Sequence, residues 1–482
     1  MKKNLLILLT AAMLGASAAG RTPAHEFRGA WMHTVWQTQY KNRTTEQNKS
    51  VLRSQLDSLQ MMGINAVIFQ VRPQADAFYK SELEPWSIYI TDGGKAPVPF
   101  WDPLQFMIDE CHARGMELHA WLNPYRVTSN TKQILSLPGK HLYKREPKRF
   151  VKYDGKLYFD PGIPENRAFI VKVVADIVSR YDVDGIHFDD YSYPYPAKGK
   201  PFPDASSFAK YGKGMKLDQW RRHNVNMLIK EVHEKIVAIK PWVRFGVSPF
   251  GIYRNNTSTP EGSATKGLET YDSLYADVLL WENEGWVDYL MPQLYWELDH
   301  KSASYRVLVE WWSAHAGKNR HLYIGQDVMR TAKKSELTEK MKLVCDRPAI
   351  GGVCWWPAYS LFGNPAGVAD SLSTIWHPAP SPGPLYPWIE SKKPESVKGL
   401  RPISDKEFRW KGNAPEGKTS DVVKYAVYRF DSMQDMISGE EGTIVSVTPS
   451  TSYRATEEGV YAVTAINRAN NESELSDPIV IH

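Results

Sequence analysis

Residues 183–191 read VDGIHFDDY, and residues 116–123 read MELHAWLN. Both stretches are mostly apolar, and the first carries the neighbouring acids Asp189 and Asp190 just before its last residue. Apolar side chains along the length of a strand are typical of a parallel sheet that helices cover on both faces. Between the two stretches, residues 165–181 repeat apolar side chains at the spacing of a helix. The order strand, helix, strand predicts a β-α-β unit.

The same alternation continues in both directions along the chain. Further strand-like runs lie at residues 27–33, 64–71, 243–249, 287–295, 321–327 and 350–356, which with 116–123 and 184–190 makes eight. Eight strands alternating with helices over roughly 350 residues predict an α/β fold, a (β/α)8 TIM barrel. We expect this barrel at residues 25–378. A doubly wound open sheet is the alternative, and the lack of a glycine-rich turn after 27–33 disfavours it.

The start of the chain and its overall charge bear on location and partners. Residues 1–19, MKKNLLILLTAAMLGASAA, combine two lysines, a short apolar run and small residues. This pattern predicts a signal peptide, and therefore an exported protein that is periplasmic, cell-surface or secreted. The apolar run is too short for a transmembrane helix, and no second long one follows. The net charge of +5 over 482 residues is too small to indicate a nucleic-acid partner.

The composition and the periodicity of the sequence change after the predicted barrel. Residues 379–396 are rich in proline, which predicts a stiff, extended linker. In the last part, residues 425–430 (YAVYRF) and 459–467 (GVYAVTAIN) alternate with a period of two. We therefore expect a small all-β sandwich at residues 397–482, with a spacer or positioning role. The run at 461–467 followed by NNES resembles the final strands of a fibronectin type III module.

The active site of such a barrel lies at the carboxyl ends of its strands, and in this chain these ends are polar and aromatic. Because side chains alternate along a strand, His187 and Asp189 should share the inward face, while Asp190 turns away or enters the loop. A carboxylate at the mouth of the barrel is well placed to act as a nucleophile or a base. The alternative is that one Asp caps the following loop while the other binds backbone amides.

Cleavage of a glycosidic bond requires a second carboxyl group as the proton donor. Asp190, Glu297 and Asp327 are the candidates, because each stands at or just after a predicted strand end. Glu297 follows Tyr295 and Trp296, which are expected to desolvate it and to raise its pKa. The alternatives are a solvated loop position for Glu297 and a helix cap for Asp327.

Other strand-end side chains suit sugar binding, since aromatic rings stack on the C–H faces of pyranoses and polar groups reach the hydroxyls. The candidates are His33, Trp36, Arg72, Trp121, Asn123, Tyr125, His187, Tyr191, Gln293, Tyr295, Trp296, Trp355 and Trp356. About half of the aromatic residues are expected to fill the upper layer of the barrel instead. An arginine among these residues could also bind a carboxylate of the ligand.

No cofactor is expected. His187, Asp189 and Asp190 alone make a weak metal pattern, because no second histidine accompanies them at ligand spacing. The chain has no G-x-S-x-G turn of a serine hydrolase and no phosphate-binding loop. A metal-dependent, deacetylase-like hydrolase therefore remains the weakest of the alternatives.

Several stretches together resemble one known family. They are FRGAWMHTVW at 27, NAVIFQVRPQADAFY at 65, LHAWLNPYR at 118, YFDPGIPENR at 158, VDGIHFDDYSYP at 183 and YLMPQLYW at 289. In this order they resemble the glycosyl-hydrolase-like 10 family, a group of exported bacterial proteins with a (β/α)8 barrel.

The resemblance implies a glycoside hydrolase that acts on a polymeric glycan, a polysaccharide partner. Some members are associated with cleaving peptidoglycan strands that have lost their stem peptides, which implies this substrate here. By analogy with other glycosidase barrels, Asp189 sits where a nucleophile commonly sits, while no motif identifies the proton donor. The alternative function is an inactive carbohydrate-binding or scaffold protein of the cell envelope.

Overall fold

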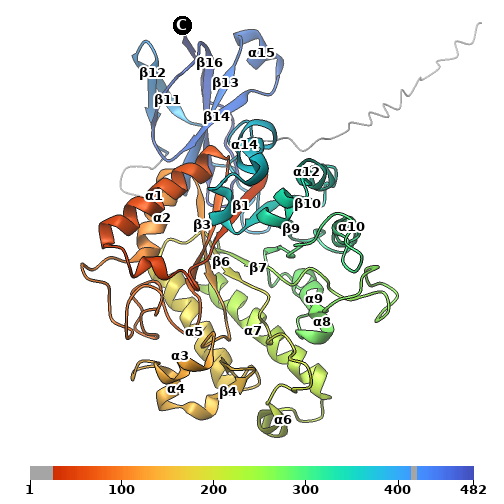
Figure 1. Ribbon diagram of the computed structural model, residues 1–482. Coiled ribbons are helices and arrows are strands. Elements are labelled where there is room, and N and C mark those ends of the chain that lie inside the picture. Colours follow the sequence, from red (N-terminus) through yellow and green to blue (C-terminus); the bar gives the residue numbers. More distant parts are fainter. Residues whose placement is uncertain (1–24, 414–420) are drawn as a thin grey trace, which may run out of the picture.

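Eight parallel strands close into a barrel in the computed structural model, which describes residues 25–413 and 421–482 (Figure 1). The strands are β1 (Phe27–Met32), β2 (Ala66–Arg72), β3 (Glu117–Leu122), β6 (Gly185–Phe188), β7 (Arg244–Val247), β8 (Tyr289–Leu290), β9 (His321–Asp327) and β10 (Ile350–Trp356). Each overlaps one of the predicted runs, so the predicted (β/α)8 barrel is confirmed. The predicted signal peptide at 1–19 lies outside the described residues.

Helices surround the barrel and account for most of the chain between its strands. The longer ones are α1 (Thr45–Met61), α2 (Pro103–Ala113), α5 (Pro164–Arg180), α7 (Leu217–Ile239), α10 (Tyr305–His315) and α12 (Leu337–Cys345). The shorter ones are α3 (Thr131–Leu135), α4 (Leu142–Arg145), α6 (Ala205–Tyr211), α8 (Thr270–Ser273), α9 (Val278–Asn283), α11 (Val328–Lys333), α13 (Ala358–Leu361) and α14 (Val368–Ser371). In the part of the chain that the structure describes, no helix is both long and apolar enough to span a bilayer.

Local sequence explains where these elements begin and end. Thr44 caps α1 through a reciprocal pair of hydrogen bonds with Gln47, and Asp102 caps α2, which starts at a proline. Strand β8 has only two residues although a longer run was predicted, because Pro292 has no N–H to donate to the ladder. A hairpin of β4 (Phe150–Tyr153) and β5 (Lys156–Phe159), which the sequence analysis did not predict, is inserted after β3.

The interior of the barrel is filled by aromatic side chains and a line of hydrogen bonds. The rings of Phe27 and Tyr323 stack with their centroids 4.2 Å apart. The hydroxyl of Tyr289 lies 3.0 Å from Nδ1 of His187 and 2.8 Å from Nδ1 of His119, whose Nε2 lies 3.2 Å from Glu117. We call these four residues, His187, Tyr289, His119 and Glu117, the polar column. It runs from the carboxyl end of the barrel to its amino end.

The last part of the chain forms the predicted small all-β module. One sheet contains β11 (Lys398–Ser404), β12 (Glu407–Lys411) and β15 (Ser452–Arg454), and the other contains β14 (Thr443–Thr448), β13 (Val422–Phe430), β16 (Gly459–Asn467) and β17 (Ile479–Ile481). A short helix, α15 (Met433–Ser438), follows β13. The Tyr461 hydroxyl donates to the carbonyl of Glu457, as in the tyrosine corner of immunoglobulin-like sandwiches. The fibronectin type III resemblance itself stays a prediction.

The proline-rich segment at 379–396, predicted as a stiff, extended linker, packs against the barrel. Tyr386 is fully buried, its hydroxyl lies 2.9 Å from that of Tyr323, and the guanidinium of Arg244 lies 4.6 Å from its ring centre. Trp388 donates from Nε1 to Asp288. These two aromatic side chains bind at the amino end of the barrel and hold the segment against it, which its proline content alone does not predict.

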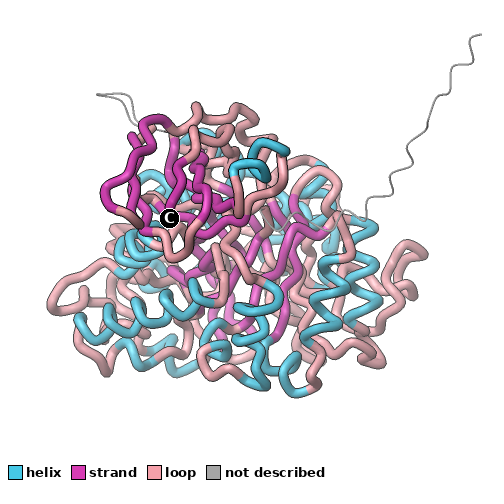
Figure 2. Tube along the Cα trace, turned by 90° about the horizontal axis from the view of Figure 1, so that it is seen from above, coloured by secondary structure: helices cyan, strands magenta, loops and turns pink. Residues whose placement is uncertain are grey.

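The sandwich reaches the same end of the barrel, so that its strands lie over one part of the barrel when viewed from above (Figure 2). Asn470 donates to Glu117 over 2.9 Å, and the amine of Lys424 lies 3.9 Å from the same carboxylate. Arg244 donates to the carbonyl of Arg468. The amino end of the barrel is therefore covered, and the carboxyl end is left for ligands.

Tyr386→Ala tests the docking of this segment. We expect the free energy of unfolding to fall by about 3–5 kcal/mol, the usual cost of truncating a buried aromatic side chain to alanine. Tyr386→Phe is the matched control, because it loses only the bond to Tyr323, worth about 1 kcal/mol. Denaturant unfolding followed by tryptophan fluorescence measures both changes. Equal stability of Tyr386→Ala and the parent would show that the segment does not support the barrel.

Candidate active site

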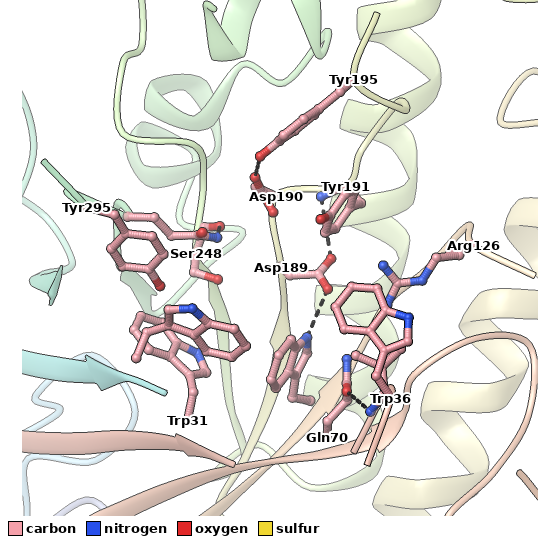
Figure 3. Close-up of a pocket in the computed structure, with 14 residues that line it drawn as sticks. Trp31, Trp36, Gln70, Arg126, Asp189, Asp190, Tyr191, Tyr195, Ser248 and Tyr295 are labelled. Carbon is pink, nitrogen blue, oxygen red and sulfur yellow. Dashed lines mark hydrogen bonds between the residues drawn. The ribbon is translucent and has the colours of Figure 1, made fainter. Parts of the chain in front are cut away.

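A pocket of about 190 Å³ opens at the carboxyl ends of the barrel strands (Figure 3). It is lined by Trp31, Val35, Trp36, Gln70, Trp121, Arg126, Asp189, Asp190, Tyr191, Tyr195, Ser248, Gln293, Tyr295 and Trp356. Eight of these are sequence-predicted candidates, namely Trp36, Trp121, Asp189, Asp190, Tyr191, Gln293, Tyr295 and Trp356. Among the lining residues, Asp189 and Asp190 are the only acids.

Asp189 is buried and held by donors from the neighbouring strand. Trp121, on β3, donates from Nε1 to Oδ2 over 3.0 Å, and the Asn123 amide donates to Oδ2 over 3.1 Å and to Oδ1 over 3.2 Å. Burial raises the pKa of Asp189, and the nearby Arg126 charge and these two donors oppose the shift. An ionised carboxylate only accepts hydrogen bonds, so this set of donors favours its charged form.

Asp190 lies in the same pocket but in a different environment. Its carboxylate accepts a hydrogen bond from the hydroxyl of Tyr195. Burial and the adjacent charge of Asp189 raise the pKa of Asp190 to about 7. Asp190 enters the loop, one of its two expected positions, because β6 ends at Phe188; strand alternation no longer governs the two acids there, and Asp190 lines the pocket.

Aromatic rings form the walls of the pocket. Tyr191 and Tyr195 stack with their centroids 5.4 Å apart, and Trp121 meets Trp356 edge-on at 6.0 Å. Trp36 is 61% exposed, and its backbone has a φ of 63°, in the left-handed region that bulky residues rarely adopt. Sites that hold such a conformation are often functional, and here it leaves the indole exposed beside the opening.

Three predicted binding residues do not line the pocket, because each is hydrogen-bonded to another side chain of the protein. Arg72 is fully buried and pairs with Glu84 through two hydrogen bonds of 2.7 and 2.6 Å, so it is not free to bind a ligand. His187 belongs to the polar column, and burial lowers its pKa well below the ordinary value. Asn123 is also fully buried and acts on Asp189 instead of on a ligand.

The other four predicted binding residues outside the pocket lining pack against neighbouring side chains. Tyr125 and Trp355 are almost completely buried in the layer between barrel and helices. Trp296 packs edge-on against Phe250, and His33 packs against Trp356 while its Nε2 lies 2.6 Å from the Gln37 amide. Tyr125, Trp296 and Trp355 are thus packing residues, but they lie outside the barrel interior and not in its upper layer, where about half of the aromatic candidates were expected.

Glu297 and Asp327 also lie outside the pocket lining. A backbone hydrogen bond, with the positive groups of His300 and Arg330, lowers the pKa of Glu297, so the expected desolvation by Tyr295 and Trp296 is wrong. Asp327 is the N-cap of α11 and accepts from the backbone N–H of Arg330 over 2.8 Å. Of the candidate donors, Asp190 alone shares the pocket of Asp189.

The glycosyl hydrolase-like 10 family model matches residues 26–341 of this chain. The chain belongs to this family. Glycosyl hydrolase YngK of Bacillus subtilis (strain 168) is 38% identical over 478 residues, covering 94% of this chain and 92% of the relative. Glycosyl hydrolase DigH of Escherichia coli (strain K12) is 39% identical over 343 residues, covering 66% of this chain and 77% of the relative. The chain is therefore a glycosyl hydrolase.

Solved structures with a similar barrel are more distant in sequence. The glycoside hydrolase domain of PgaB (BpsB) from Bordetella bronchiseptica is 12% identical, with a TM-score of 0.47, over 73% of this chain and 98% of that chain. The catalytic domain of β-amylase from Paenibacillus polymyxa is 12% identical, with a TM-score of 0.48, over 74% of this chain and 99% of that chain.

Other pocket residues of this glycosyl hydrolase were not selected from the sequence. Gln70, Arg126 and Ser248 stand at or just after predicted strand ends, and a rule that kept every polar side chain there would have found them. Trp31 lies within β1 and Tyr195 in the loop after β6, where no local pattern marks them. Within residues 25–413 and 421–482, no cluster of three or more His, Cys, Asp or Glu side chains is placed to hold a metal ion.

A set of acid-to-amide variants distinguishes Asp190 from the two excluded donors. We expect Asp190→Asn to lower the rate of glycan hydrolysis by about 10²–10⁴-fold, the usual contribution of a general acid. Glu297→Gln and Asp327→Asn should hydrolyse at the parent rate, since neither lines the pocket and asparagine still caps a helix. Rates are measured as reducing ends released per unit time. A large loss in Glu297→Gln with Asp190→Asn active would reverse the assignment.

Proposed function

We propose that this glycosyl hydrolase cleaves bonds between amino sugars in peptide-free peptidoglycan strands, after export to the periplasm or the cell surface. The observation that carries the chemistry is the pair of neighbouring acids in one pocket, of which Asp189 receives N–H donors while the pKa of Asp190 is raised to about 7. The family resemblance of the sequence supports the substrate, and the predicted signal peptide supports the location.

In the proposed reaction, Asp190 gives its proton to the oxygen that bridges two sugars. The two acids repel each other when both are charged, so near neutral pH one proton remains on the pair. The proton resides on Asp190, because the donors from Trp121 and Asn123 stabilise the charge on Asp189. Asp189 then faces the positive charge that develops at the anomeric carbon as the C–O bond breaks, and a water molecule adds to this carbon and returns a proton to Asp190.

The aromatic walls provide the binding energy for a sugar chain. A pyranose ring presents C–H groups that pack on the flat faces of tryptophan and tyrosine, while its hydroxyls reach polar side chains. Trp36 and Tyr195 are 61% and 40% exposed, so both rings remain accessible at the opening. An open rim of this kind supports a polymeric substrate, of which several sugars lie outside the pocket.

The substrate assay compares polymers directly. Purified protein is incubated with peptide-free peptidoglycan strands, intact peptidoglycan and a neutral N-acetylglucosamine polymer, and new reducing ends are counted. We expect release from the peptide-free strands, and loss of release in Asp189→Asn. If the parent binds these strands but releases no ends from any polymer, the inactive carbohydrate-binding alternative replaces the proposal.

The pH dependence of kcat/KM reports the protonation of Asp190. The pKa of Asp190 is raised, and the acid must carry its proton, so activity should fall as the pH rises through about 7. Removal of the Tyr195 hydroxyl in Tyr195→Phe takes away a donor that stabilises the charged carboxylate, which raises the pKa of Asp190 further. In Tyr195→Phe, the fall of kcat/KM on the alkaline side of the pH profile should therefore occur at higher pH than in the parent.

Tyr191→Phe is the matched control for this shift, because Tyr191 stacks on Tyr195 but its hydroxyl makes no hydrogen bond to Asp190 in the described residues. Its basic limb should stay where the parent has it. A limb that does not move in Tyr195→Phe, or that moves equally in Tyr191→Phe, would contradict the assignment of Asp190 as the donor.

A further inference from the structure

We infer that Arg126 forms a subsite for a carboxylate group carried by the sugar substrate. This inference rests on the proposed function and deepens it, because it names the chemical feature of the glycan that the pocket recognises. It depends on the hydrogen bonds, burial and surroundings of one arginine side chain.

Arg126 is the one buried arginine of the described residues that has no carboxylate partner. Four others each pair with an acid at 2.6–3.2 Å, namely Arg28 with Glu26, Arg72 with Glu84, Arg221 with Asp204 and Arg244 with Glu117. Arg126 is only 6% exposed, yet its guanidinium donates only to the carbonyl of Pro73, from Nε over 3.1 Å and from Nη2 over 2.8 Å. Its Nη1 makes no hydrogen bond to a described residue.

A buried charge that forms no ion pair costs free energy, and an anionic group that binds beside it would offset this cost. The guanidinium lies 5.1 Å from the ring centre of Tyr191, which restrains it, and it lines the same pocket as Asp189. Its charge opposes the rise in the pKa of Asp189, but the two side chains form no ion pair. Nη1 therefore remains available to an anionic group that enters the pocket.

A second donor in the pocket is also without a partner. The Gln70 side-chain oxygen accepts from the backbone N–H groups of Thr34 and Val35, each over 2.9 Å, which fixes the orientation of the amide. Its Nε2 is buried and has no hydrogen-bond acceptor among the described residues. In Figure 3, Gln70, Arg126 and Trp36 lie on one side of Asp189, with Trp31 and Tyr295 on the other. Arg126 and Gln70 thus offer one charged and one neutral donor on the same side of the pocket as the exposed indole of Trp36.

These features fit a singly charged carboxylate better than a doubly charged phosphate. Nη1 of Arg126 is free to donate a charge-assisted hydrogen bond to one carboxylate oxygen. A doubly charged phosphate would be repelled by the neighbouring Asp189. In glycans, this chemistry has two sources: the lactyl ether of a muramic acid residue and the carboxyl group of a uronic acid. A stem peptide converts the lactyl carboxylate into an amide, so the subsite would distinguish strands with and without peptides.

The decisive comparison uses one polymer in two charge states. Peptide-free strands are tested before and after their carboxylates are converted to methylamides, and kcat and KM are measured for each. We expect the parent to prefer the free acid by about 10- to 100-fold in kcat/KM, mostly through KM, as for a lost hydrogen bond to a charged group. Equal kcat/KM values for the two polymers would overturn the inference without any variant.

Two variants test whether Arg126 causes the preference for the free acid over the methylamide. Arg126→Gln should lose most of the preference, because it removes the charge, whereas Arg126→Lys should keep much of it. Equal losses on the free and the amidated strands in Arg126→Gln would show that Arg126 only supports Asp189. A polyuronate in parallel identifies the source of the carboxylate: cleavage of that polymer alone would assign a uronate, and cleavage of the peptide-free strands alone the lactyl group.

Binding to Asp190→Asn separates this inference from the proposed function. Calorimetry with short peptide-free oligosaccharides, free and amidated, is carried out on Asp190→Asn and on the same variant with Arg126→Gln. Tighter binding of the free acid that disappears with Arg126→Gln supports the subsite even if the parent cleaves none of the polymers. If the parent hydrolyses both polymers and the free and amidated oligosaccharides bind equally well, the proposed function stands and the carboxylate subsite is contradicted.

Discussion

The hydrogen bonds from Trp121 and Asn123 to Asp189 are the constraint on which the rest of the site depends. Two neighbouring acids of the same residue type can differ in protonation only if their surroundings differ. The barrel supplies this difference, because β3 and β6 are adjacent and Trp121 is in register with His187, two residues before Asp189. Burial raises the pKa of both acids, and Asp190, which receives no such N–H donors from β3 and lies beside the charge of Asp189, reaches a pKa of about 7. The proposed division of roles between the acids thus depends on the pairing of β3 with β6.

The polar column continues this arrangement through the interior of the barrel. Nε2 of His187 is within hydrogen-bond distance of both Trp31 and Ser248, which line the pocket, and its other nitrogen leads through Tyr289 and His119 to Glu117. Burial keeps the pKa of His187 low, so the imidazole is neutral and serves to position its neighbours. Buried polar groups that satisfy one another in this way fix a single arrangement of the surrounding rings.

The sequence predicted the barrel, its strands and the location of the site, but not the direction of each side chain. Periodicity locates a strand end to within a few residues, whereas a shift of one residue moves a side chain to the other face. In β10, Trp355 packs among the helices and its neighbour Trp356 lines the pocket. In β2, the register shifts between Gln70 and Arg72, and the first side chain reaches the pocket while the second pairs with Glu84. The role of Asp190 and the docking of Tyr386 both depend on contacts between distant segments, which no local pattern contains.

The covered amino end of the barrel has a consequence for how such chains can be recombined. Glu117, inside the barrel, relies on Asn470 and Lys424 of the sandwich, and Asp288 relies on Trp388 of the proline-rich segment. An appended module of unrelated sequence would leave these carboxylates facing apolar or unmatched surface. The change in composition near residue 379 therefore does not mark a point at which the sandwich can be exchanged freely, because a replacement module would have to supply new partners for both carboxylates.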